Sequence, residues 1–277
     1  MHALLATVLI ATGARAATLE VCHADSLAGP MRELKRAFEA RNPATVLNLT
    51  SGVSRDLAAR IVKGDACDVF LPSSPAVIDQ DMLGKKIDGS GKDAATWYVV
   101  VSANEMVVIT AKGNPLGIAR VTDLARPNVK LARVTGEKDL ATGRTIEFLK
   151  RAAAAEGQAD AAQKILDAAP ADAAKPTSVP DTVNAVKEGR ANAGVVYYSA
   201  AVAARNDVDI VRFADSVNLS EAIRNAATVP GSSTNAREAT AFVAFLLTPE
   251  AQAIFKDTGQ PPVVPALRKG AVPVDIP

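Results

Sequence analysis

The amino-acid sequence predicts an α/β fold of two lobes, each a mostly parallel sheet flanked by helices, joined by two crossing segments. From Leu19 onward, short apolar runs alternate with amphipathic stretches, which is the pattern of repeated strand–helix units. The segment 97–115 holds two apolar runs separated by a few polar residues, more than one strand needs. We interpret this segment as a crossing into a second lobe, where the alternation resumes.

Each lobe is predicted to combine short strands with amphipathic helices. The first lobe should contain the strands LEVCHA, TVLNLT and CDVFLPSS, with helices over 26–43 and 54–64. The second lobe should contain strands at 130–135 and 193–199, with helices at 142–157, 161–168 and 180–189. The chain should then return through 209–214 and the stretch ending at Pro230, and two helices over 235–259 should close the first lobe.

These patterns predict the domain boundaries. Residues 1–16 join a short apolar run to a small-x-small ending, which is typical of a secretory signal peptide, so we expect an exported protein. Residues 17–104 and 214–277 should form the first lobe and 105–213 the second, with hinges near Asn104 and Phe213. No later stretch approaches the roughly 20 apolar residues that a membrane-spanning helix needs.

Composition and motifs narrow the classes of function. The chain has 31 Lys and Arg against 30 Asp and Glu, without a basic cluster that interleaves aromatics, so nucleic acid is not expected as a partner. The only histidine after the signal segment, His23, lies inside the first strand, where we expect it to be packed. GxSxG, HExxH, P-loop and GxGxxG strings do not occur, so we expect no enzyme, no cofactor and no directly bound metal. Cys22 and Cys67 are compatible with either a disulfide or two buried thiols.

Hydroxyl residues recur where a loop gives way to a predicted helix, at Ser26, Ser54, Thr142 and Ser178. Each is compatible with an ordinary N-cap, and Ser178 with Asp181 fits a capping box. However, loops after parallel strands gather at one sheet edge, so several helix amino ends should face one cleft. Backbone N–H groups and hydroxyls there favour an anion, and a fully deprotonated tetrahedral oxyanion has only acceptors to offer.

Seven segments carry a resemblance that spans almost the whole chain after residue 16. They are HADSLAGPM, SRDLAARI, CDVFLPSS, WYVVVSANEMVV, GRTIEFL, AGVVYYSAA and FLLTPEAQ. In this order the chain resembles the periplasmic molybdate- and tungstate-binding proteins of ABC transporters. The resemblance implies a two-lobed periplasmic-binding-protein-like fold, capture of molybdate or tungstate by lobe closure, and delivery to ABC permease and ATPase subunits. It also implies a periplasmic monomer without a cofactor.

The same resemblance assigns the oxyanion contacts. Ser26 matches the first hydroxyl donor and Ser54 the second, with Ser51 as the alternative to Ser54. Backbone donors are implied at Thr142 and Val179, and a phenol donor at Tyr197.

The WYV–NE segment is similar to the archaeal-type branch, whose members can place carboxylates at the metal of the anion. This chain has Leu140 and Val179 at those two places, with Asp139 one position away, which favours tetrahedral hydrogen bonding. Asp25 would repel an anion and is not expected among the contacts.

Three alternatives stay open at this point. The ligand can be sulfate, phosphate, a carboxylate or a chelated metal. An enzyme on the same scaffold would have to use His23, Asp25 or a tyrosine. A sensory or scaffolding domain would bind a partner protein through the cleft.

Overall fold

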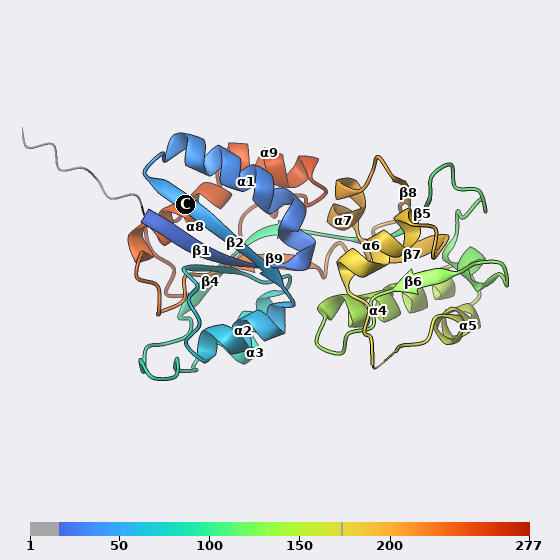
Figure 1. The fold of residues 1–277 in the computed structure, drawn as a ribbon, viewed down its shortest axis with the longest axis horizontal. Helices are drawn as coiled ribbons and strands as arrows, with labels where there is room; N and C mark the ends of the chain where they lie inside the picture. The colour runs from blue at the N-terminus through green and yellow to red at the C-terminus, as the bar shows by residue number, and fades with distance from the viewer. Residues whose placement is uncertain (1–16, 173) are drawn as a thin grey trace, which may run out of the picture.

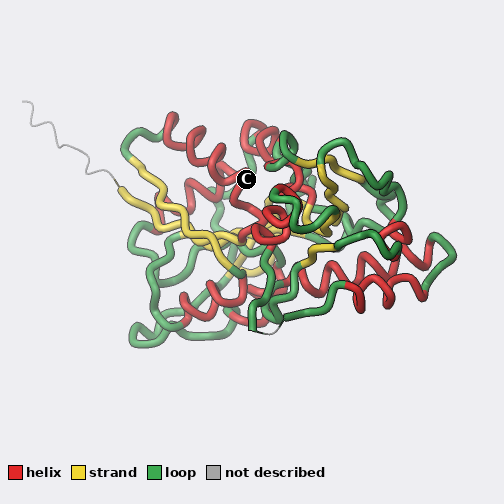
Figure 2. The backbone as a smooth tube through the Cα atoms, turned by 45° about the vertical axis from the view of Figure 1, so that its right-hand side comes forward, coloured by secondary structure: helices red, strands yellow, loops and turns green. Residues whose placement is uncertain are grey.

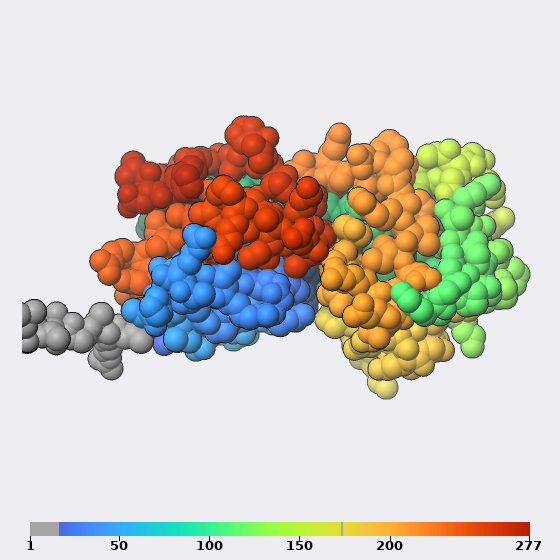
Figure 3. All heavy atoms as spheres, turned by 90° about the horizontal axis from the view of Figure 1, so that it is seen from above, coloured from blue at the N-terminus to red at the C-terminus, as the bar shows by residue number. Residues whose placement is uncertain are grey.

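The computed structural model describes residues 17–172 and 174–277, and the predicted signal peptide lies outside this range. Figure 1 shows two lobes connected by extended chain, and Figure 2 shows helices packed around the strands of both. Seen from above, the two lobes meet along a narrow boundary (Figure 3). None of the described helices is both long and apolar enough to cross a membrane.

The first lobe contains two three-stranded sheets. One is parallel, with the order β2 (Thr45–Gly52), β1 (Ala17–Ala24), β3 (Val69–Leu71). The other is antiparallel, with the order β10 (Arg268–Gly270), β4 (Trp97–Ala103), β9 (Arg224–Ala227). An antiparallel bridge between Phe70 and Thr228 joins the two sheets, so residues from both ends of the chain build this lobe.

Helices cover both faces of these sheets. They are α1 (Ala28–Arg41), α2 (Ser54–Val62), α3 (Pro75–Asp81), α8 (Ala236–Leu246) and α9 (Pro249–Asp257). Side chains alternate along β1, so Val21 packs in the cluster under α1 and α8 and Cys22 packs in the cluster under α2 and α3. The Phe38 ring lies 5.0 Å from that of Phe242, which fixes α1 against α8.

The second lobe is built on one four-stranded sheet. Its order is β6 (Leu131–Arg133), β7 (Ala193–Tyr197), β5 (Met106–Ala111), β8 (Val208–Val211). The helices α4 (Leu140–Ala155), α5 (Asp160–Ala168), α6 (Val179–Lys187) and α7 (Tyr198–Ala203) surround it. Alternate residues of β5 enter opposite cores, Val108 one and Val107 the other, so this sheet too is buried on both faces.

The predicted fold class is confirmed, but the prediction of mostly parallel sheets is wrong. Only three of the seven pairings between named strands in the described residues are parallel. Parallel neighbouring strands need a crossover connection, usually a helix. β4 and β5 are separated by only two residues, so no helix lies between them. The strands that join the lobes therefore pair antiparallel with segments that return much later in the chain.

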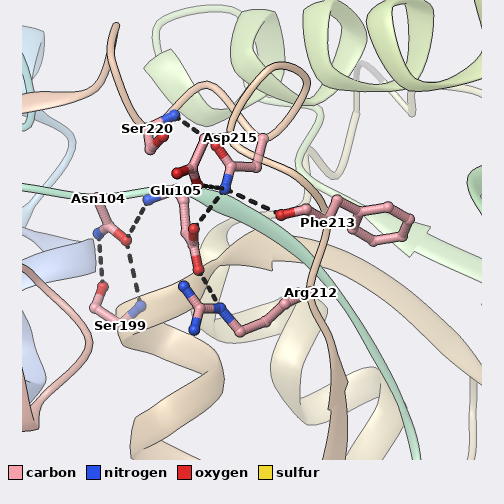
Figure 4. Close-up of polar contacts among 8 residues, drawn as sticks. Asn104, Glu105, Ser199, Arg212, Phe213, Asp215 and Ser220 are labelled. Atoms are coloured by element: carbon pink, nitrogen blue, oxygen red, sulfur yellow. Dashed lines mark hydrogen bonds and ion pairs between the residues drawn. The ribbon is translucent and has the colours of Figure 1, made fainter. Parts of the chain in front are cut away.

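Two crossing segments join the lobes, residues 104–105 between β4 and β5 and residues 212–223 between β8 and β9. Buried Glu105 holds them together, because its carboxylate accepts from Arg212 Nε at 2.6 Å and from Asn218 Nδ2 at 2.6 Å (Figure 4). Leu219 and Ile223 pack in the core of the second lobe. Residues beyond the predicted boundary at Phe213 therefore still pack against the second lobe.

Two sequence features near β1 have a clear structural setting. Cys22 and Cys67 are free thiols, both buried in the cluster under α2 and α3.

His23 is 2% exposed, and its Nδ1 lies 2.9 Å from the carbonyl oxygen of Ala24. Burial lowers the pKa of His23 below its ordinary value, and Arg32 lowers it further, against the Ala24 hydrogen bond and the Asp25 charge. The folded protein therefore disfavours the charged imidazole.

We expect His23 to make the folded protein less stable in mild acid. A histidine whose folded-state pKa is depressed contributes stability above its unfolded value of 6.5, and that stability is lost as the pH falls through the folded-state pKa. Urea unfolding at pH 7.5 and 5.5 should show a smaller loss for His23→Asn than for the wild type. An equal loss in both proteins would contradict this assignment.

Candidate ligand-binding site

A small cavity lies between the lobes. The first lobe lines it with residues that follow its strands, namely Ala24, Asp25, Ser26, Gly52, Val53, Ser54 and Ser73. The second lobe lines it with Asp139, Leu140, Val179 and Tyr197. Because both lobes contribute, the cavity is complete only when they are together.

Strand register explains how the first lobe's residues converge. β1 pairs in parallel with β2 and β3, so Ala24 lies beside Gly52 and His23 beside Leu71. The three strands therefore end at the same edge of the sheet, which is where open α/β folds bind ligands. Beyond that edge the chain continues into the short 3₁₀ helix at Asp25–Leu27, into α2, and into Ser73.

Two helix amino ends reach the cavity from the second lobe. α4 begins at Leu140, with the Asp139 carboxylate capping it by accepting from Ala141 N–H at 2.9 Å. α6 begins at Val179, and Ser178 with Asp181 forms the predicted capping box. The first N–H groups of a helix have no intrahelical acceptor and carry its positive dipole end. Leu140 and Val179 thus bring backbone donors to the lining.

Buried hydroxyls supply further donors. Ser26 Oγ and Tyr197 Oη are both buried and have no hydrogen-bond partner among the described residues. Ser54 Oγ accepts from Ser73 N–H at 3.1 Å and lies 3.3 Å from Ser73 Oγ. An unpaired buried hydroxyl costs free energy, so Ser26 and Tyr197, one from each lobe, leave two donors free for a ligand.

Two carboxylates also line the cavity, whereas no Lys or Arg does among the described residues. Asp25 accepts a hydrogen bond from Ser51 Oγ. Burial raises the pKa of the Asp139 carboxyl, and the Asp25 charge raises it further, against the lowering by Ala141 N–H. Burial also raises the pKa of the Tyr197 phenol, and so does the nearby Asp139, against lowering by Arg144 and by the neighbouring Ser73 side chain, which is not within hydrogen-bonding geometry of Tyr197 Oη. Tyr197 therefore stays a neutral donor.

The structure brings together four of the five residues that the sequence singled out, Ser26, Ser54, Val179 and Tyr197. Thr142 does not line the cavity. Its N–H donates to Asp139 O at 3.0 Å and its Oγ1 donates to Gly136 O at 2.6 Å. Ser51 is absent from the lining as well, because its hydroxyl is bonded to Asp25.

The expected N-caps need correction at three positions. α4 starts two residues before Thr142, with Asp139 as its cap. The residue preceding α2 is Val53, and Ser54 is already helical. Ser26 lies inside the 3₁₀ helix that precedes α1. Ser26 and Ser54 therefore do not satisfy the first N–H groups of their own helices, and this leaves their hydroxyls for other contacts.

Sequence reasoning missed Ser73, named Asp139 and Leu140 without placing them among the contacts, and set Asp25 aside. Ser73 follows the third parallel strand, at the same edge where Ser26 and Ser54 follow the first two. Applying the strand-end rule to every parallel strand would have found it. Asp139 is itself a common N-cap residue three positions before Thr142, and that local signal also marks Leu140 as the first helical residue.

Comparison with known proteins defines the class. Residues 19–260 match the family model described as bacterial extracellular solute-binding protein, so the chain belongs to this family. The molybdate-binding protein ModA of Mycobacterium tuberculosis is 28% identical over 210 residues, which is 75% of this chain and 70% of that protein.

Solved structures share the two-lobed fold. The periplasmic molybdate-binding protein of Azotobacter vinelandii has a TM-score of 0.68 at 19% identity, covering 89% of this chain and 99% of that one. The sulfate-binding protein SubI of M. tuberculosis has a TM-score of 0.68 at 17% identity, covering 90% and 88%. At these identities the likeness establishes the architecture, which proteins for different ligands share.

We expect Tyr197→Phe to leave the ligand-free protein as stable as the wild type, or up to about 2 kcal/mol more stable, because it removes an unpaired buried hydroxyl. Urea unfolding measures the difference. Tyr98→Phe is the matched control, since the Tyr98 hydroxyl donates to Asp79 at 3.3 Å and its removal should cost about 0.5 kcal/mol. A loss above about 1 kcal/mol for Tyr197→Phe would show that its hydroxyl is already paired.

Proposed function

We propose that this protein captures a tetrahedral oxyanion, molybdate or tungstate, between its lobes and delivers it to an ABC importer. One observation carries the proposal. Ser26 Oγ and Tyr197 Oη, from opposite lobes, are buried without hydrogen-bond partners among residues 17–172 and 174–277, and both residues line the same cavity. An acceptor-only ligand would pair both hydroxyls and draw the lobes together.

The remaining lining suits the same ligand. The amino ends of α4 and α6 add backbone donors at Leu140 and Val179, and Ser54 adds a third hydroxyl. Helix dipoles and neutral donors stabilise an anion without a charged side chain in contact. The oxyanion contacts proposed here are therefore Ser26, Ser54, Leu140, Val179 and Tyr197.

Relatives support the choice of anion. The M. tuberculosis relative is named as a molybdate-binding protein, and so is the A. vinelandii protein of the same fold. The family is described as extracellular solute-binding proteins, which supports export and transport over catalysis. The proposed partners are the permease and ATPase subunits of an importer, and the proposed working form is a periplasmic monomer.

Asp25 and Asp139 favour a second candidate ligand. Both carboxylates line the cavity and can accept a hydrogen bond. An oxyanion that carries a proton, such as hydrogen phosphate, would offer a donor to one of them, whereas molybdate would not. Direct titration separates these candidates.

Calorimetric titration of the protein without residues 1–16, unfolded and refolded to remove carried ligand, should show one-to-one binding of molybdate and tungstate. Sulfate and phosphate, titrated at the same pH, should bind far more weakly. Tight binding of phosphate alone would replace molybdate by the protonated oxyanion. Absence of heat with all four anions would refute oxyanion capture.

Ser26→Ala and Ser54→Ala should each weaken binding of the anion found by titration. A hydrogen bond to a charged group is worth about 1.5 to 3 kcal/mol, or roughly 10- to 100-fold in Kd. Thr142→Val is the control, because Thr142 does not line the cavity and should leave Kd within about twofold. Unchanged affinity in both serine variants would remove these residues from the site.

A further inference from the structure

The carbonyl of Ser26 is held by two buried side chains that lie far away in the sequence. Ser199 Oγ donates to Ser26 O at 2.8 Å, and Gln260 Nε2 donates to the same oxygen at 2.9 Å. The hydroxyl of Ser26 has no partner among the described residues, although the residue lines the oxyanion cavity. Ser26 is thus anchored through its backbone while its side chain stays free.

The two anchors belong to different lobes. Gln260 lies in the first lobe, where its Oε1 accepts from Ser102 Oγ at 3.0 Å and from Asn225 Nδ2 at 2.9 Å. Ser199 lies in the first turn of α7 in the second lobe. The Ser199–Ser26 hydrogen bond therefore connects the lobes directly beside the cavity, and it is fully buried.

Ser199 is also bonded to the first crossing segment. Its Oγ accepts from Asn104 Nδ2 at 2.8 Å, and its N–H donates to Asn104 Oδ1 at 3.4 Å (Figure 4). The same Asn104 oxygen accepts from Glu105 N–H at 3.0 Å. A continuous path of hydrogen bonds thus runs from the hinge through Ser199 to Ser26.

Ser199 is also close in sequence to a residue of the site. Tyr197 ends β7 and lines the cavity, and Ser199 follows two residues later without lining it. The bond from Ser199 to Ser26 therefore sets the position of the first lobe's free hydroxyl relative to that of the second lobe. Misplacement of either donor would weaken binding, because hydrogen-bond strength falls steeply with poor geometry.

We propose that Ser199 is a positioning residue of the oxyanion site, which couples the hinge to Ser26 and orients the Ser26 hydroxyl toward the anion. This inference rests on the proposed function. Ser199 does not line the cavity. If it acts by placing the Ser26 hydroxyl, its contribution to affinity should largely vanish when residue 26 has no hydroxyl.

A double-mutant cycle tests this. Molybdate and each other anion that binds the wild type are titrated into the wild type, Ser26→Ala, Ser199→Ala and the double variant. Ser199→Ala should raise Kd roughly 3- to 10-fold in the wild-type background and less than about 2-fold in the Ser26→Ala background. Equal effects in both backgrounds, or an unchanged Kd for Ser199→Ala alone, would overturn the proposal.

Two further variants separate positioning from general stability. Thr228→Val removes another buried hydroxyl-to-carbonyl bond, to Trp97 O in the first lobe, and should lower the urea midpoint without changing Kd. Ser199→Cys is close to Ser in side-chain size but carries a much weaker donor. It replaces Ser199→Ala in the cycle if Ser199→Ala does not fold. If the wild type binds none of the four anions, the proposed function itself fails. Equal effects of Ser199→Ala in both backgrounds would instead overturn only the role of Ser199.

Discussion

The parallel pairing of β1 with β2 and β3 is the constraint on which the rest of the molecule depends. It ends three strands at one edge, so that Ser26, Ser54 and Ser73 meet although they are far apart in sequence. Cores on both faces of β1 hold this register, since a shift by one residue would exchange Val21 and Cys22 between them. The cavity is therefore a consequence of the sheet.

The two crossing segments are held together by buried polar groups, whereas most of the interior is apolar. Glu105 is buried, and its carboxylate is paired with Arg212 and Asn218 from the other crossing segment. The Arg212 guanidinium also lies 4.5 Å from the centre of the Tyr198 ring, next to Tyr197 of the cavity. Directional bonds of this kind define one geometry, whereas apolar contacts tolerate sliding. The crossing segments thus set where the second lobe's donors lie.

The sequence was sufficient for the class of fold, and it named four of the residues that line the cavity between the lobes. Hydroxyls at the starts of predicted helices pointed to Ser26 and Ser54, and the resemblance to the molybdate-binding family pointed to Val179 and Tyr197. The expected start of α4 at Thr142 was two residues late, because the stronger N-cap Asp139 was not weighed against Thr142. Local reading likewise could not detect the pairing of β4 with β9, whose residues are more than 120 positions apart. For the same reason no signal in the sequence indicated that Leu219 and Ile223 pack in the core of the second lobe.

The two crossing segments give the lobes unequal connectivity. The second lobe is one continuous stretch whose ends meet, since Met106 N–H donates to Asn218 O at 2.8 Å. The first lobe is split, and its β4 has no partner until β9 and β10 have been made. During synthesis from the amino terminus, the inserted lobe is therefore complete in sequence before the lobe that contains it. A chain truncated after residue 223 would hold all of the second lobe, but β4 of the first lobe would lack its partners β9 and β10. The last fifth of the sequence therefore completes the first lobe.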